Sequence, residues 1–316
     1  RHRIALSLFL LLGLLAASTS HAAVQLGSEV LAARGFRELQ GRRVGLLTNP
    51  SGVNRKGKST IDLLRDAPGV RLVALFGPEH GLDGKARAGD AVAGKVDPRT
   101  GLPVHSLYGA TRKPTPEMLQ GIDVLVYDLQ DNGCRSYTYI STMGLAMEAC
   151  AEAGVEFLVL DRPNPLGGLR VEGPMVEEPF RSFVSQWDVP YVYGMTCGEL
   201  ANMINGERWI SKPCRLRVVP MTGWRRSMVW SDTDLPWIAT SPNIPNTRAC
   251  LGYAALGLLG ELSGGSGLSI GGALNRPFQC VAAPWLDADL LSRQLKRHKL
   301  PGVEFGPFHA LRDNRR

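Results

Sequence analysis

A dense polar segment, residues 127–139, holds side chains suited to chemistry. Asp128 and Asp131 supply carboxylates, Gln130 an amide and Arg135 a guanidinium, and tyrosines flank them on both sides. A pair of acidic groups can cleave a glycosidic bond, one as general acid and the other as nucleophile or base. Amide, guanidinium and phenol groups can hold a sugar. The segment alone would also suit a phosphate or a metal, and the interpretation we favour is half of a sugar-cleaving site.

An apolar run at residues 122–126 leads into this segment, and an amphipathic run at 140–153 follows it. This order is typical of a strand whose carboxyl end opens into a site before a helix. Helix starts are also predicted at Ser59 and at Thr115 with Pro116. The apolar runs predict strands at residues 44–48, 71–76, 104–108, 122–128, 156–160 and 215–220. Continuous apolar strands spaced by helices indicate a parallel sheet covered on both faces, in a Rossmann-like α/β fold.

Polar clusters follow four of these strands, at residues 48–52, 77–81, 128–131 and 161–165. Because the carboxyl ends of parallel strands lie along one edge of a sheet, we expect the clusters to converge. Turn formation explains their Pro, Gly and Asn residues but not their acidic and basic groups. The candidates for substrate binding are Asn49, His80, Gln130, Arg135, Tyr137, Tyr139, Asp161, Arg162 and Asn164.

Glu79 is the third catalytic candidate, beside Asp128 and Asp131. It can serve as the general acid if an apolar neighbour such as Phe76, or a tryptophan from later in the chain, raises its pKa. His80 and Arg135 would instead lower the pKa of Glu79. The sequence leaves this balance open.

Two other chemistries are weaker interpretations. Residues 52–59 fit the pattern of a phosphate-binding loop, but residues 49–51 separate it from the preceding strand, so we read it as a basic turn with Ser59 capping a helix. Glu79, His80 and the two aspartates offer acidic and imidazole ligands, but no two-histidine spacing is present. We therefore expect no metal and no cofactor.

The composition and the N-terminus indicate an exported protein. Residues 1–22 combine a basic start, a short apolar run and small residues before Ala22, which predicts a cleaved signal peptide. We expect a periplasmic or secreted protein with no stable membrane insertion after cleavage. The net charge of +7 is scattered and not interleaved with aromatic residues, so no nucleic-acid partner is expected. Export permits disulfides among the six cysteines, and buried free thiols are the alternative for some of them.

The domain boundary is predicted near residue 220, where the alternation of strands and helices stops and the chain becomes rich in Trp, Pro and Gly. We predict a Rossmann-like catalytic domain at residues 23–219 and a smaller α+β C-terminal domain at residues 220–316.

Ten short motifs resemble those of the exo-β-N-acetylmuramidases of peptidoglycan turnover, the NamZ family. They lie at residues 76–82, 107–109, 114–119, 128–131, 135–139, 161–165, 171–174, 193–200, 241–245 and 283–285. The resemblance covers roughly residues 40–305. The set is specific, although each motif alone would be weak.

The resemblance implies release of terminal N-acetylmuramic acid from the non-reducing ends of peptidoglycan-derived glycans or muropeptides. It implies a site between the two domains, and it makes Glu79 the catalytic glutamate of the Gly-Pro-Glu-His-Gly motif. Asp131, Asp128 and then Glu172 are the candidates for the second group, and Glu172 is also a substrate-binding candidate. Arg135 or Arg162 would pair with the lactyl carboxylate of the substrate.

Two departures from the family pattern keep an alternative open. The Gly-rich loop at residues 263–272 lacks the Glu and Arg of the family's Glu-Gly-Arg-Gly sequence. Family members also continue for some tens of residues beyond position 303, so truncation of the C-terminal domain is an expectation. The alternative function is a non-catalytic periplasmic protein that binds muropeptides or sugars.

Overall fold

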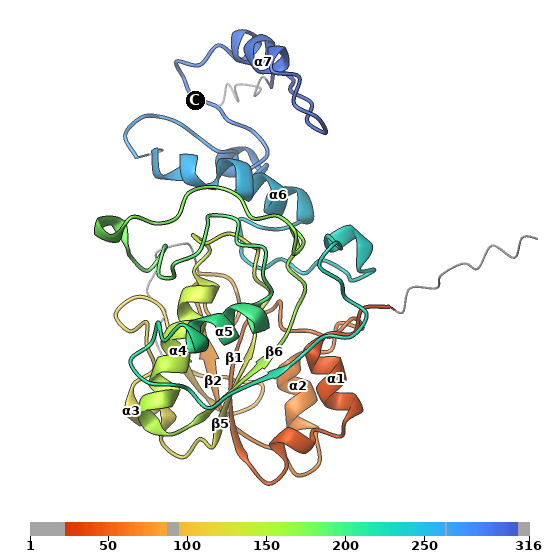
Figure 1. The fold of residues 1–316 in the computed structure, drawn as a ribbon, viewed down its shortest axis with the longest axis vertical. Helices are drawn as coiled ribbons and strands as arrows, with labels where there is room; N and C mark the ends of the chain where they lie inside the picture. Colours follow the sequence, from red (N-terminus) through yellow and green to blue (C-terminus); the bar gives the residue numbers. More distant parts are fainter. Residues whose placement is uncertain (1–22, 87–94, 263, 309–316) are drawn as a thin grey trace, which may run out of the picture.

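The computed structural model describes residues 23–86, 95–262 and 264–308, and it is built on one seven-stranded sheet (Figure 1). The strand order is β3-β4-β2-β1-β5-β6-β7. All neighbours pair in parallel except β3 and β4, which are antiparallel. The strands are β1 (Arg43–Thr48), β2 (Arg71–Gly77), β3 (Lys95–Val96), β4 (Pro103–Ser106), β5 (Val124–Asp128), β6 (Glu156–Leu160) and β7 (Leu216–Val219). The predicted Rossmann-like parallel sheet is confirmed.

Helices cover both faces of the sheet, as the continuous apolar strands require (Figure 1). On one face lie α1 (Gly27–Ala33) and α2 (Thr60–Arg65); on the other lie α3 (Pro116–Leu119), α4 (Tyr139–Ala153) and α5 (Cys197–Gly206). The predicted caps are present: Ser59 accepts from the backbone N–H of the third residue after it, and so does Thr115. The 3₁₀ helices span Arg37–Leu39, Glu178–Phe180, Trp230–Asp232, Gly257–Leu262 and Gly272–Leu274.

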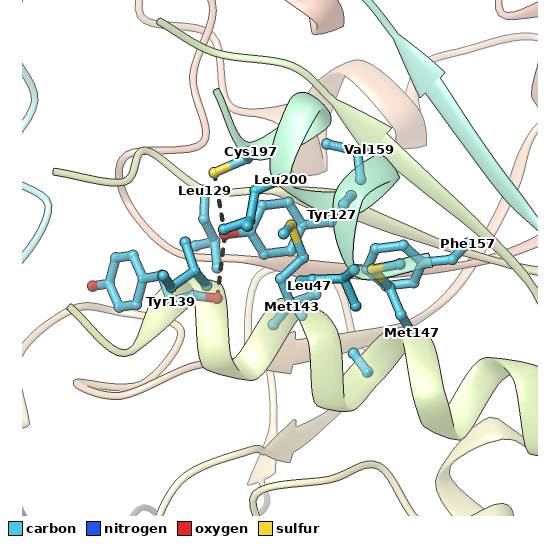
Figure 2. Close-up of a cluster of buried hydrophobic side chains, with 14 of the residues drawn as sticks. Leu47, Tyr127, Leu129, Tyr139, Met143, Met147, Phe157, Val159, Cys197 and Leu200 are labelled. Atoms are coloured by element: carbon cyan, nitrogen blue, oxygen red, sulfur yellow. Dashed lines mark hydrogen bonds between the residues drawn. The ribbon is translucent and has the colours of Figure 1, made fainter. Parts of the chain in front are cut away.

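The larger core lies between the sheet and α4 with α5 (Figure 2). Tyr127 and Phe157 are fully buried there, and each such side chain contributes about 1.5–3 kcal/mol. Gly144 lies inside α4 because a Cβ atom at this position would come within 2.0 Å of the Trp187 ring. The Trp187 indole donates to the Ile140 carbonyl at 2.9 Å. Gly144 and the Trp187 ring thus set how closely α4 approaches the segment between β6 and α5.

Strand ends differ slightly from the prediction. β4 ends at Ser106 rather than at residue 108, because the Ser106 hydroxyl makes local hydrogen bonds to the backbone of Tyr108. The two-residue strand β3 was not predicted, since a pair of residues carries no alternating pattern.

The chain beyond β7 packs on the sheet domain and then extends away from it (Figure 1). Met228, Trp230 and Leu235 form a small core with Val24 and Leu26. Two longer helices follow, α6 (Thr247–Leu256) and α7 (Ala288–Arg297). In the described part of the predicted second domain, β-type pairing is limited to isolated bridges such as Ser269 with Ala282. The predicted boundary at residue 220 falls directly after the last strand.

The predicted signal peptide lies outside the described residues. Within the described ranges, no helix is both long and apolar enough to cross a membrane. All six cysteines are free thiols, and five of them are buried. Of the two possibilities that the sequence left open, the structure shows buried thiols.

Candidate functional site

Hydrogen bonds join the loops that follow β1, β5 and β6. The Ser51 hydroxyl accepts from the Gln130 backbone N–H at 3.0 Å, and the Gln130 side-chain amide donates to the Pro163 carbonyl at 2.8 Å. The three strands are neighbours in the sheet, so their carboxyl ends lie side by side. The structure therefore brings three of the four predicted clusters into direct contact.

Glu79 adds the loop after β2 to this edge. It is partly buried, and its Oε2 accepts a hydrogen bond from the Thr138 hydroxyl at 2.6 Å. Thr138 immediately precedes α4, so Glu79 lies at the helix that leaves the polar segment. The sequence analysis missed Thr138, because a threonine at a helix start is ordinarily read as a cap.

His80 points into its own loop. Its backbone has φ of 70°, in the left-handed region that non-glycine residues rarely adopt, and Gly81 follows at 77°. Its Nδ1 lies 2.8 Å from the Ala86 carbonyl, and the side chain is buried. This geometry shapes the turn that carries Glu79. Substrate binding by His80 stays a prediction.

Asp131 is a buried carboxyl with unequal oxygens. Its Oδ2 accepts from the Gly133 N–H at 2.7 Å and from the Tyr193 hydroxyl, whereas Oδ1 has no partner in the described chain. Burial raises the pKa of Asp131 to about 6, against the opposing effect of these hydrogen bonds. A carboxyl group that titrates near neutrality suits proton transfer. Tyr193 is a further contact that the sequence analysis did not select.

Asp128 lies in a different environment three residues earlier. Its two oxygens face Arg162 at 2.5 and 3.1 Å, and the Thr60 hydroxyl donates to Oδ2. The pair is almost completely buried. Arg162 also donates to the Val53 carbonyl at 2.8 Å. Both members have their hydrogen-bonding capacity directed at protein groups, an arrangement typical of a structural ion pair.

Asn49, Tyr137 and Tyr139 meet a segment from beyond the sheet domain. Tyr139 donates its hydroxyl to the Thr240 carbonyl, which also accepts from Asn49 Nδ2 at 3.2 Å. Tyr137 donates to the Thr240 hydroxyl at 2.8 Å. Tyr253 of α6 packs edge-on against Tyr137, with ring centroids 5.7 Å apart. These contacts bring the later part of the chain to the site edge. Thr240 carried no signal of its own, beyond preceding the motif at residues 241–245.

Arg135 and Glu172 lie away from the strand ends. Arg135 Nη1 donates to the carbonyls of Pro174 and Val189, at 2.7 and 2.6 Å, and thereby joins two loops. Glu172 is exposed, and its backbone pairs with Val192. Within the described residues, no hydrogen bond or ion pair joins either residue to Glu79 or Asp131, and their roles stay predictions.

Asp161 and Asn164 organise the loop after β6. Asp161 accepts from the Gly198 N–H at 2.8 Å and from the Thr196 hydroxyl at 2.9 Å, at the start of α5. Burial raises its pKa to about 6. Asn164 accepts from the Leu166 N–H and donates to the Met195 carbonyl, both at 2.9 Å. Asp161 also lines a surface cavity of about 320 Å³ together with Glu199, Asn202 and Trp224.

No group of three or more His, Cys, Asp and Glu side chains in the described ranges is placed to hold a metal ion. The chemistry available at the strand ends is that of carboxyl, amide and phenol groups. Carboxyl groups and polar side chains thus lie at the carboxyl edge of a parallel sheet, where ligands bind in such folds, and a pair of carboxyl groups is the chemistry that glycosidases use.

Comparison with known protein families and sequences identifies the family of this chain. The model for the N-terminal part of exo-beta-N-acetylmuramidase NamZ matches residues 44–248, and the model for its C-terminal part matches residues 251–311. The chain is 47% identical, over 282 residues, to the peptidoglycan beta-N-acetylmuramidase NamZ of Bacillus subtilis (strain 168). That alignment covers 89% of this chain and 67% of the relative. The chain therefore belongs to the NamZ family of exo-β-N-acetylmuramidases.

Two crystal structures of DUF1343 family proteins from Bacteroides fragilis NCTC 9343 are similar to this fold. The first is 56% identical with a TM-score of 0.85, covering 91% of this chain and 72% of that protein. The second is 35% identical with a TM-score of 0.66, covering 78% and 63%.

Proposed function

We propose that this protein is a peptidoglycan β-N-acetylmuramidase that releases terminal N-acetylmuramic acid from the non-reducing ends of glycan fragments. The family membership supports this function. The observation that carries it is the placement of Glu79, the glutamate of the family's Gly-Pro-Glu-His-Gly motif. It lies in the loop after β2, where it accepts a hydrogen bond from Thr138, the residue immediately before α4.

In this proposal Glu79 and Asp131 divide the two acidic roles of glycoside cleavage. One protonates the departing glycosidic oxygen, and the other attacks the anomeric carbon or activates a water molecule. Asp131, with its pKa of about 6 and an unpaired oxygen, supplies a group that can exchange a proton near neutral pH. Asp128 is the weaker candidate because Arg162 and Thr60 already occupy its oxygens.

Arg135 remains our candidate for the lactyl carboxylate, although its Nη1 already donates to two carbonyls. Arg135→Ala tests the role on matched muramic and glucosamine glycosides. A selective loss on the muramic substrate supports lactyl binding, and equal losses on both assign Arg135 to loop structure instead.

We also propose a periplasmic or secreted location, supported by the sequence pattern of residues 1–22. The substrate would then be peptidoglycan-derived glycan or muropeptide. Fusing residues 1–22 to a reporter that is active only after export tests the location, and reporter activity equal to a fusion without them contradicts it.

The deciding experiment measures release from a chromogenic N-acetylmuraminide by the wild type and by Glu79→Gln, with and without a chelator. Glu207→Gln, an exposed position at the end of α5, is the matched control. We expect chelator-insensitive turnover by the wild type and the control, and its loss in Glu79→Gln. Binding of the glycoside by the wild type without turnover would favour the non-catalytic alternative, and turnover that survives Glu79→Gln would remove the catalytic assignment.

A further inference from the structure

The Thr138 hydroxyl serves Glu79 rather than its own helix. Thr138 occupies the N-cap position of α4, but its side chain makes no capping hydrogen bond. Polar N-cap residues of the other long helices do cap: Thr196 caps α5, Asn246 caps α6 and Asp287 caps α7. The 15-residue helix at the centre of the site therefore lacks the side-chain cap that these three helices have.

The backbone explains this difference. A capping side chain normally requires an extended N-cap residue, such as Thr196 at φ −76° and ψ 165°. Thr138 instead has helical angles of −69° and −7°, which turn its hydroxyl away from the N–H groups of the first turn. The hydroxyl donates to Glu79 Oε2 at 2.6 Å, and the Thr138 residue is buried, so bulk water competes little for this bond. The helix loses a cap worth about 1 kcal/mol, while the carboxyl group gains a fixed donor.

The two ends of this bond differ in how firmly they are held. Tyr139, the next residue, is fixed by the Thr240 carbonyl and by Asn49, and Trp187 donates to the Ile140 carbonyl at 2.9 Å. Glu79, by contrast, precedes a turn with left-handed residues and has no second hydrogen bond or ion pair from the described chain. The orientation of its carboxyl group depends on Thr138.

We propose that Thr138 is a positioning residue that fixes the Glu79 carboxyl group for its reaction. This inference rests on the function proposed above. Productive geometry must be held to within about 0.5 Å, and a displacement of about 1 Å can cost roughly 100-fold in rate. Loss of the hydroxyl should therefore act on turnover more than on substrate affinity.

The test compares kcat, KM and thermal midpoint for Thr138→Val, Thr138→Ser and a matched control, Thr142→Val. Thr142 lies one turn further along α4, is fully buried, and has a hydroxyl without a partner in the described structure. We expect Thr138→Val to lower kcat by about 10- to 100-fold with KM within about twofold. Thr138→Ser, which keeps the hydroxyl, should restore most of kcat, and Thr142→Val should change neither constant.

Several outcomes would overturn the inference. An unchanged kcat in Thr138→Val would do so, as would a raised KM with normal kcat, which would assign Thr138 to substrate binding. An equal loss of kcat in Thr138→Ser would show that the methyl group matters instead of the hydroxyl. If Thr138→Val does not fold, Thr138→Ala removes the same hydroxyl and is read in the same way. Absence of turnover in the wild type would instead remove the proposed function, and so the two failures are distinguishable.

Discussion

Asp128 and Glu79 are two carboxyl groups at strand ends that receive the same kind of hydrogen bond. Each accepts from a threonine hydroxyl at the start of a helix, Thr60 of α2 for Asp128 and Thr138 before α4 for Glu79. Asp128 is also completely buried against Arg162, whereas Glu79 is partly exposed and has no cationic partner among the described residues. The shared hydrogen bond therefore does not decide the role.

The other groups around each carboxyl group decide its role. A buried carboxylate whose oxygens are filled by a guanidinium stabilises the fold only while that partner is present. A carboxyl group with one free oxygen can still exchange a proton or contact a substrate. The difference predicts that changes around Asp128 reduce stability and that changes around Glu79 reduce turnover.

The largest expected effect is that of Glu79→Gln. The substitution keeps the acceptor for Thr138 but removes the ionisable group, so kcat should fall by about 10²- to 10⁴-fold while the thermal midpoint changes little. Steady-state kinetics and a melting curve on the same preparation measure both. A variant that melts early with normal kcat would reverse the comparison.

Next in size is Arg162→Met, which leaves Asp128 buried without its cation. We expect a loss of about 3–5 kcal/mol in the free energy of unfolding, measured by denaturant titration. Arg43→Met is the control, because Arg43 is exposed and its partner Asp123 is only partly buried, so solvent reaches the pair. Equal stability losses in the two variants would contradict a special role for the buried pair.

Asp131 is intermediate between the two, since it is buried like Asp128 but has one unpaired oxygen like Glu79. Its pKa of about 6 in the folded state lies above the unfolded value of about 3.9, so the folded protein binds the proton more tightly. Stability from this group is present below about pH 4 and is lost as pH rises to about 6.

Asp131→Asn should remove this dependence and flatten the unfolding free energy between about pH 4 and 6 by up to about 3 kcal/mol. Asp161, with a similarly raised pKa, leaves a residual slope. Asp234→Asn, at an exposed left-handed position that asparagine tolerates, is the control. A pH profile of Asp131→Asn that matches the wild type would contradict the titration of Asp131 in this range.

The smallest effect is expected for Thr60→Val, which removes one hydrogen bond to Asp128 but keeps Arg162. A hydrogen bond to a charged group contributes about 1.5–3 kcal/mol, so the loss of stability should be about 2 kcal/mol. Thr142→Val, which removes a buried hydroxyl without a partner, should change stability less. If Thr60→Val lowered kcat as strongly as Thr138→Val, the surroundings of Asp128 and of Glu79 would not differ in function.

Much of the sheet could be predicted from sequence because continuous apolar runs and helix starts are local signals. Residues 156–160 form β6 as predicted, and Ser59 caps α2. The convergence of the strand ends could also be predicted from the sequence, since it depends only on parallel pairing.

The role of each site residue could not be predicted from the sequence, because it depends on partners that are distant in the chain. Asp128 and Asp131 look equivalent in sequence, and their partners separate them: Arg162 and Thr60 for Asp128, and Tyr193 for Asp131. Thr138 was missed because the choice between capping a helix and binding Glu79 depends on its backbone angles. Thr240 contributes a backbone carbonyl, which every residue has, so no sequence pattern can mark it.

The Thr240 carbonyl also sets an order of events during synthesis of the chain. Asn49 and Tyr139 emerge from the ribosome well before the oxygen to which both donate. Translation proceeds at about 5–20 residues per second, so the 191 and 101 residues that separate Asn49 and Tyr139 from Thr240 take about 5–40 s to be made. Before residue 240 has been added and folded, the loops after β1 and β5 lack this acceptor. Completion of the site is therefore one of the later steps in making this protein.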